Sequence, residues 1–309
     1  MRTQNNLGVK MKKFIIISDS SCGLEKELRD KYDIQYLPMY YCFDGKTIPA
    51  SNDWEEISAK EFYDMMRQGT RFTTAQVTPS SYKEAFERAI NDGYDVLSIS
   101  CPAVISNGVN SSMIVRDELL KKHPESKIIC IDAYSCCFGL GLLCIEASKM
   151  RSAGKTIEET AEWVINNRDR FHQEGSVSTL EYLKRAGRVS AAKAFFGGLL
   201  NVKPIIMCDV KGRNAVVEKV KGRKASLDRI VERFKERYIA GVCDYIFISH
   251  ADCLEDAETV KNMIRDQIGD DPVEIKIGYV VSPIGATVGP GMIGVYFYGE
   301  QITHDGAID

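Results

Sequence analysis

Three continuous apolar runs, each followed by polar residues, stand out in the first half of the chain. They occupy residues 14–17, 95–100 and 127–132. Strands that are buried on both faces of a parallel sheet have this composition. Residues with helical spacing of apolar positions separate the runs. The first half therefore predicts an α/β unit with a mainly parallel sheet and flanking helices.

Helix boundaries are well marked in this half. Ser58 and Glu61 have the spacing of a capping box, and Thr78 before Pro79 places an N-cap hydroxyl ahead of an N1 proline. Helices are also predicted over 138–151 and 157–171, with His172 as a cation at the end of the second. The short polar break between these helices predicts a domain boundary. We therefore expect domains at 12–153 and 154–309, preceded by a disordered leader at 1–11.

The second half has a different pattern. Apolar runs at 203–208 and 215–220 flank Lys211-Gly212-Arg213-Asn214, which is a hairpin signal. Further strands are predicted at 245–250, 273–277 and 293–298, and helices at 226–239 and 254–268. This order predicts a mixed sheet with helices. The fold class is thus α/β, with two domains.

Composition narrows the function classes. The 309 residues are 44% hydrophobic and 27% charged, with a net charge of -3, which is typical of a globular protein without a nucleic-acid or anionic-membrane partner. No segment has the length of a membrane span, and the first residues lack the apolar stretch of a secretory signal. The ten cysteines include no Cys-x-x-Cys pair. We expect a cytoplasmic protein with reduced thiols, no metal and no cofactor.

Hydroxyl groups gather where the predicted strands end. In open α/β sheets ligands bind outside the carboxyl ends of the strands, and helix N-termini there favour an anion. This pattern suits a carboxylate or a phosphate, although serine and threonine in loops also serve as caps and turn formers. The residues are Ser18, Ser20, Ser21, Thr73, Thr74, Thr78, Ser98, Ser100, Ser106, Ser111 and Ser112.

Catalytic alternatives have weaker support. An acyl ester or thioester hydrolase would pair Ser106, or a nearby serine, with His250 at the end of a predicted strand. A buried, hydrogen-bonded structural histidine is the simpler interpretation. Gly-x-Ser-x-Gly and Walker patterns do not occur, and no Gly-x-Gly-x-x-Gly follows directly after a predicted strand. Asp19 and Asp132 each follow a strand, and loop hydrogen bonding is preferred over metal ligation for both.

Two groups of glycines have more than one interpretation. Gly139 and Gly141 lie in an apolar helical context, where small residues allow close packing. The adjacent glycines within 195–200 indicate a break between two buried elements, or a space for a long apolar ligand.

A set of short motifs resembles the DegV family of bacterial fatty-acid-binding proteins over nearly the whole chain, from Phe14 to Tyr298. The motifs occur in family order and at family spacing. They are Ser18-Asp19-Ser20, residues 74–79 (TAQVTP), 105–108 (ISNG), 131–135 (IDAYS) with Gly139-Leu140-Gly141, 179–188 (TLEYLKRAGR), 199–205 (LLNVKPI) and Gly289-Pro290-Gly291.

The resemblance implies a non-catalytic lipid carrier that holds a long-chain, palmitate-like fatty acid in an interdomain tunnel. The family residues that hold the carboxylate match Thr74 and Ser106. Some members present the acid to a fatty acid kinase, and the arginine associated with that step matches Arg188. Further expected ligand contacts are Ser20, Thr78, Gly285 and Thr287.

Three departures from the family pattern bear on the head group. Ala75 and Val77 replace the usual serine and proline, and the loop before Ser106 is one residue longer. Thr287 stands where the family has a histidine. The substitution removes a possible cation near the carboxylate, so it bears on the kinase partnership more than on the fold. A ligand-free regulatory protein is a third alternative.

Overall fold

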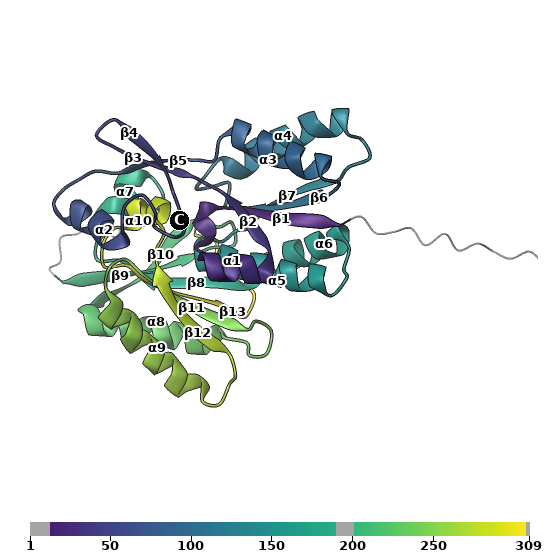
Figure 1. Ribbon diagram of the computed structural model, residues 1–309. Coiled ribbons are helices and arrows are strands. Elements are labelled where there is room, and N and C mark those ends of the chain that lie inside the picture. The colour runs from purple at the N-terminus through teal and green to yellow at the C-terminus, as the bar shows by residue number, and fades with distance from the viewer. Residues whose placement is uncertain (1–12, 190–200, 307–309) are drawn as a thin grey trace, which may run out of the picture.

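The computed structural model describes residues 13–189 and 201–306, which form three sheets (Figure 1). The predicted leader and the double glycine of 195–200 lie outside these ranges. The first sheet is parallel, with strand order β2-β1-β6-β7. Its strands are β1 (Phe14–Asp19), β2 (Ile34–Leu37), β6 (Asp95–Ser100) and β7 (Ile128–Asp132). The predicted parallel α/β unit is confirmed.

Helices cover both faces of this parallel sheet. One face packs on the aromatic and aliphatic side chains of α3 and α4, among them Tyr82, Phe86, Val115 and Leu119. The other face packs mainly on α5, a helix shared with the larger sheet. The helices of this region are η1 (Ser20–Cys22), α1 (Lys26–Tyr32), α3 (Pro79–Asn91), α4 (Gly108–Lys122), α5 (Phe138–Ser152) and α6 (Ile157–Asn167).

The largest sheet is mixed, as predicted, with strand order β10-β9-β8-β13-β11-β12. Only the β11–β12 pair is parallel among its described pairs. Helices α8 (Arg223–Arg237) and α9 (Leu254–Ile268) cover one face (Figure 1). The strands are β8 (Phe171–Ser176), β9 (Val202–Cys208), β10 (Asn214–Lys221), β11 (Tyr245–His250), β12 (Glu274–Tyr279) and β13 (Ile293–Tyr298).

Helix α5 lies between the parallel sheet and the mixed sheet. Every residue from 138 to 148 is buried, because the helix contacts β1 and β6 on one side and β8, β11 and β13 on the other. Its glycines allow this approach: a Cβ at Gly141 would be 2.6 Å from the carbonyl oxygen of Cys22, and one at Gly139 would collide with Ser135. The close-packing interpretation of these glycines is confirmed.

A third, antiparallel sheet has the order β4-β3-β5 and was not predicted. With α2 it packs on α7, α10 and the mixed sheet, so Phe62 and Tyr63 share a core with Leu180 and Val288. Residues from both halves of the chain thus build one core, and the division at 153/154 remains a prediction. The elements are β3 (Tyr40–Phe43), β4 (Lys46–Pro49), β5 (Thr73–Ala75), α2 (Ala59–Arg67), α7 (Glu181–Ala186) and α10 (Ser282–Val288).

The prediction for His172 was wrong. Helix α6 ends at Asn167, a short turn η2 (Arg168–Arg170) follows, and His172 lies in the buried strand β8. Its Nε2 is 2.7 Å from the carbonyl oxygen of Glu300, and its ring stacks on Phe297. The sequence of β8 is polar, so nothing in its periodicity indicates a strand. The polar side chains of β8 find hydrogen-bond partners in neighbouring elements, and these partners make the burial of the strand possible.

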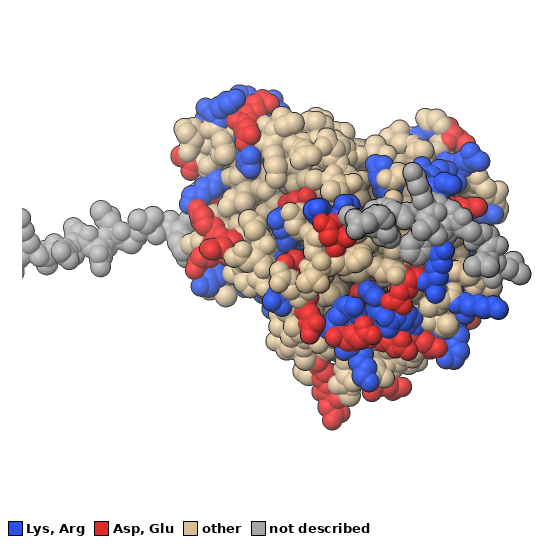
Figure 2. Space-filling model, turned by 180° about the vertical axis from the view of Figure 1, so that it is seen from behind, with Lys and Arg blue, Asp and Glu red and all other residues tan. Residues whose placement is uncertain are grey.

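The surface carries charges of both signs. Lys and Arg side chains alternate with Asp and Glu side chains over the face seen in Figure 2, without a broad field of one sign. Within residues 13–189 and 201–306 no helix is long and apolar enough to cross a membrane. The same ranges contain no group of three His, Cys, Asp or Glu side chains arranged to hold a metal ion.

Candidate functional site

The carboxyl end of β1 forms one side of the candidate site. The Asp19 carboxylate accepts hydrogen bonds from the amides of Ser21 (2.9 Å) and Cys101 (2.8 Å), and also from the Ser21 hydroxyl. Burial raises the pKa of Asp19 against the effect of these hydrogen bonds. The hydroxyl of Ser20 accepts the Met39 amide at 2.9 Å. The loop hydrogen-bonding interpretation of Asp19 is therefore confirmed.

Ser106 lies in the loop that follows β6, which we call the Ser106 loop (residues 101–107). The Asp19 carboxylate accepts a hydrogen bond from the first amide of this loop, that of Cys101. The Asp132 carboxylate accepts one from the amide of Ala103 at 3.0 Å. Ser106 is half-buried, and its Oγ is 3.4 Å from the amide nitrogen of Gly108. Within the described residues its hydroxyl donates no hydrogen bond, so the proton remains available for a ligand.

Ser111 and Ser112 were counted among the hydroxyls at the strand ends, and the structure instead places both in a helix. Both lie near the start of helix α4, where they are buried. The Ser112 hydroxyl donates to the carbonyl of Val109, and Ser111 accepts the Gln76 side-chain amide at 2.9 Å. These hydroxyls therefore support the helix and connect it to the segment after β5.

Thr74 occupies the middle of the short strand β5, opposite Tyr41 of β3. Its side chain is half-buried, whereas those of Thr73 and Ala75 on either side are exposed. Alternation along a strand therefore turns Thr74 toward the interior. Its hydroxyl has no hydrogen-bond partner within the described ranges. Helix α10 contacts both β5 and η1, so the elements that carry Thr74, Ser20 and Thr287 lie together.

Two other predicted hydroxyls have partners of their own. Thr78 caps α3, where its Oγ1 accepts the amide of Ser81 at 3.1 Å. Thr287 donates to the carbonyl of Ile284 at 2.8 Å within α10. Gly285, two residues earlier, faces the ring of Tyr63 so closely that a Cβ would be 2.5 Å from the tyrosine hydroxyl. Their local roles are thus a helix cap, a bond within a helix, and close packing.

Arg188 follows α7 and has an exposed side chain. Its Nε donates to the carbonyl of Ile105 at 2.9 Å, and its Nη1 donates to the carbonyl of Ala186 at 2.7 Å. The backbone carbonyl of Arg188 accepts the side-chain amide of Asn214 in β10 at 3.0 Å. Sequence reasoning did not anticipate the contact with Ile105, because 83 residues separate the two positions.

His250 has the environment of a structural histidine. It is buried at the end of β11, where its Nδ1 accepts the amide of Cys253 at 3.2 Å and its ring lies against Tyr279. Burial lowers its pKa. The neighbouring Ser249 shares a hydrogen bond with Tyr296 instead. The predicted structural role of His250 is confirmed, and within residues 13–189 and 201–306 no hydrogen bond joins it to Ser106.

Buried cysteines near the site have suppressed reactivity. Burial raises the pKa of Cys22 to about 11 and that of Cys137 to about 12. The thiolate is the reactive form of cysteine, and it is scarce at neutral pH when the pKa is this high. These two thiols therefore act as packing groups rather than nucleophiles.

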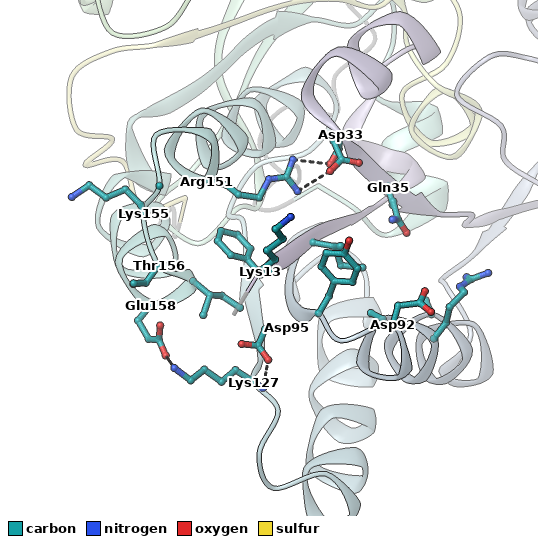
Figure 3. Close-up of a pocket in the computed structure, with 18 of the residues that line it drawn as sticks. Lys13, Asp33, Gln35, Asp92, Asp95, Lys127, Arg151, Lys155, Thr156 and Glu158 are labelled. Carbon is teal, nitrogen blue, oxygen red and sulfur yellow. Dashed lines mark hydrogen bonds and ion pairs between the residues drawn. The ribbon is translucent and has the colours of Figure 1, made fainter. Parts of the chain in front are cut away.

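A cavity of about 880 Å³ lies at the opposite, amino edge of the parallel sheet (Figure 3). Two ion pairs lie among its charged lining residues, Arg151 with Asp33 and Lys127 with Glu158. None of the predicted ligand residues lines it. The cavity and the hydroxyl cluster are therefore separate features of the fold.

Comparison with known proteins decides the family. The family model described as "Uncharacterised protein, DegV family" matches residues 13–300. The chain belongs to the DegV family. A DegV domain-containing protein of Clostridium perfringens is 37% identical over 291 residues, which cover 94% of this chain and 99% of that protein.

Solved DegV structures share the fold. The chain aligns with a fatty-acid-binding DegV family protein of Thermus thermophilus at a TM-score of 0.81 and 25% identity, covering 93% of this chain and 100% of that one. It also aligns with DegV of Bacillus subtilis, a fatty acid binding protein, at a TM-score of 0.79 and 23% identity, covering 94% and 100%. The parallel sheet, the mixed sheet and their helices are thus the DegV architecture.

Proposed function

We propose that the protein binds a long-chain fatty acid in a tunnel between its two predicted domains and acts as a carrier. The observation that carries the proposal is the pair of half-buried hydroxyls, Thr74 and Ser106, that donate no hydrogen bond within the described residues of a DegV fold. Both would donate to the carboxylate. The fatty acids bound by DegV relatives of similar fold support this choice of ligand.

Hydroxyl donors suit a buried carboxylate that has no cation beside it. Ionised acceptors make hydrogen bonds worth about 1.5–3 kcal/mol each, and a buried carboxylate needs its lone pairs satisfied. Ser20 can add a donor, because its Oγ accepts the Met39 amide and keeps its own proton. Thr78 and Thr287 contribute only by exchanging their present partners. Gly285 would shape the wall through its contact with Tyr63.

The hydrocarbon tail supplies most of the affinity in this proposal. A palmitate-like acid has about fourteen methylene groups, and burial at about 0.8 kcal/mol each gives roughly 11 kcal/mol before costs. Association and ordering of the tail remove several kcal/mol of this sum. The head-group hydroxyls therefore set the orientation of the acid and discriminate it from neutral lipids.

The carrier would present its bound acid to a fatty acid kinase, and Arg188 would contact that partner. The exposed guanidinium is compatible with such a contact. A carrier needs no catalytic residues of its own, and the surroundings of His250 and Ser249 offer nothing that favours the hydrolase alternative.

Co-purified lipid tests the ligand. Protein expressed in bacteria is denatured and extracted, and the extract is analysed by mass spectrometry. We expect about one C14–C18 acid per chain. If no such acid co-purifies and none binds on addition, fatty acid binding is wrong.

Paired variants on one strand test the head group. Thr74→Ala should weaken the binding of palmitate by roughly tenfold, the value of one charged hydrogen bond, and that of hexadecanol far less. Thr73→Ala removes the neighbouring exposed hydroxyl and serves as the control. Equal losses for acid and alcohol would show that Thr74 does not contact the carboxylate.

A further inference from the structure

The Ser106 loop is held from two sides. The parallel sheet holds it through carboxylates at the ends of two strands, Asp19 on the amide of Cys101 and Asp132 on the amide of Ala103. The amides of Ile105 and Ser106 both donate to the carbonyl of Pro102, which closes the turn. These contacts fix the beginning and the shape of the loop. They leave the carbonyl of Ile105, directly before Ser106, for a partner from elsewhere.

On its second side, residues from the later half of the chain contact the Ser106 loop. The Nε of Arg188 donates to the Ile105 carbonyl at 2.9 Å. The turn between β9 and β10 packs on the same loop, since a Cβ at Gly212 would lie 2.6 Å from side-chain atoms of Pro102. Gly212 has a positive φ of 76°, so a glycine suits both this turn and the close approach.

The anchoring of Arg188 makes this contact directional. Its amide donates to the carbonyl of Leu183 at 3.0 Å, and its carbonyl accepts Asn214 of the mixed sheet at 3.0 Å. The Nη1–Ala186 hydrogen bond fixes the guanidinium beside its own backbone. Hydrogen bonds thus attach Arg188 to α7 and the mixed sheet, while the acceptor belongs to the loop of the parallel sheet.

We propose that Arg188 is a positioning residue, a latch that holds Ser106 in its ligand-binding place through the carbonyl of Ile105 and so sets how long the fatty acid stays bound. This inference rests on the proposed function for its ligand. Separation of Arg188 from the loop frees the carbonyl beside Ser106 and lets the hydroxyl leave the head group. We expect the effect on dissociation, because a head group that loses its contact with Ser106 leaves the site faster.

Dissociation kinetics provide the first test. The fluorescent polyene cis-parinaric acid is loaded and its release followed by stopped flow in excess palmitate. Arg188→Ala should speed release by roughly five- to tenfold, as expected for the loss of one net hydrogen bond. Arg185→Ala is the control: it removes the same charge from α7, and its guanidinium lies over the ring of Tyr182, 4.9 Å from the centroid. Equal release from both variants and the wild type would overturn the latch.

A double-mutant cycle separates the latch from general destabilisation. If Arg188 acts through Ser106, the Arg188→Ala substitution should change release by less than about twofold in a Ser106→Ala background. Multiplicative effects of the two substitutions would show that Arg188 acts by another route, and the proposal would fail.

Hydrogen exchange keeps the test independent of the ligand. In the ligand-free protein, Arg188→Ala should speed amide exchange at Ile105 and Ser106 relative to Arg185→Ala. Unchanged exchange overturns the latch. A wild-type protein that binds no fatty acid, but whose loop exchanges faster in Arg188→Ala, would refute the proposed function while showing that Arg188 holds the Ser106 loop.

Discussion

The hydroxyl of Tyr63 in α2 lies against the α-carbon of Gly285 in α10, where a Cβ would be only 2.5 Å from the tyrosine oxygen. The same hydroxyl donates to the carbonyl of Val280 at 2.6 Å. A side chain from the first half of the chain therefore determines how closely α10, the helix of Thr287, approaches. The pair accounts for a glycine at this position by packing alone.

Gly285→Ala should destabilise the fold by about 1–3 kcal/mol, because the added methyl group displaces the ring of Tyr63. Tyr63→Phe should cost about 0.5–1.5 kcal/mol for the hydrogen bond to Val280. The double variant should lose less stability than the sum of the two single losses, because the nearest clashing atom, the tyrosine oxygen, is gone. Urea unfolding of the four proteins measures this coupling, and strict additivity would contradict the packing account.

Gly141→Ala probes the close approach of α5 to η1. A Cβ there would lie 2.6 Å from the Cys22 carbonyl oxygen and 2.8 Å from Leu24. Backbone cannot move aside cheaply, so we expect a loss of about 1–3 kcal/mol in the free energy of unfolding despite the better helix propensity of alanine. Ser152→Ala at the exposed end of the same helix is the control. A stabilised Gly141→Ala variant would show that the helix has room to shift.

Thr287→Val tests whether this threonine shares the head group. Its hydroxyl already donates to Ile284 at 2.8 Å. We therefore expect palmitate affinity to fall by less than about twofold, against roughly tenfold for Ser106→Ala, whose proton is available. Isothermal titration of both variants gives the comparison. A larger loss in Thr287→Val would mean that the hydroxyl leaves Ile284 when the acid binds.

Glu174 and Arg233 form a buried ion pair between β8 and α8, with Nε and Oε2 2.6 Å apart. Arg233→Met should destabilise the protein at pH 7 by about 3–5 kcal/mol, because it leaves the carboxylate buried without its guanidinium. Lys224→Met, on the exposed surface of the same helix, provides the control for loss of one positive charge. Chemical denaturation measures both.

The same pair predicts a pH dependence. Burial alone would raise the pKa of Glu174, but contacts with His172 and Arg233 lower it below its ordinary value of 4.5. The stabilisation is therefore present above pH 4.5 and is lost as the pH falls through the lowered value. In Arg233→Met the effect of burial on Glu174 dominates, so protonation of Glu174 removes the cost of a buried, unpaired carboxylate. The difference in the free energy of unfolding between the variant and the wild type should be smaller at pH 4 than at pH 7. A larger difference at pH 4 would contradict this sign.

Strands with strong apolar runs were predictable, and strands without them were not. The runs that became β1, β6, β7 and β11 are buried on both faces, so composition alone marks them. Strand β8 reads Phe-His-Gln-Glu-Gly-Ser, and its burial depends on partners such as Arg233, 59 residues away from Glu174. Strands β3 and β4 form a local hairpin around Asp44-Gly45, a turn signal that the sequence analysis missed. Strand β5 joins them through long-range pairs such as Cys42 with Thr73, which local spacing does not reveal.

By itself the sequence determined the helix cap at Thr78, the hydrogen-bonding roles of Asp19 and Asp132, and the order of motifs that marks the DegV family. These features depend on the spacing of residues that are close in the sequence, so the sequence alone reveals them. Only the tertiary structure decided which hydroxyls keep a free proton and that Arg188 reaches the carbonyl beside Ser106. Both follow from contacts between segments far apart in the chain, where the geometry of packed sheets, and not residue type, chooses the partner.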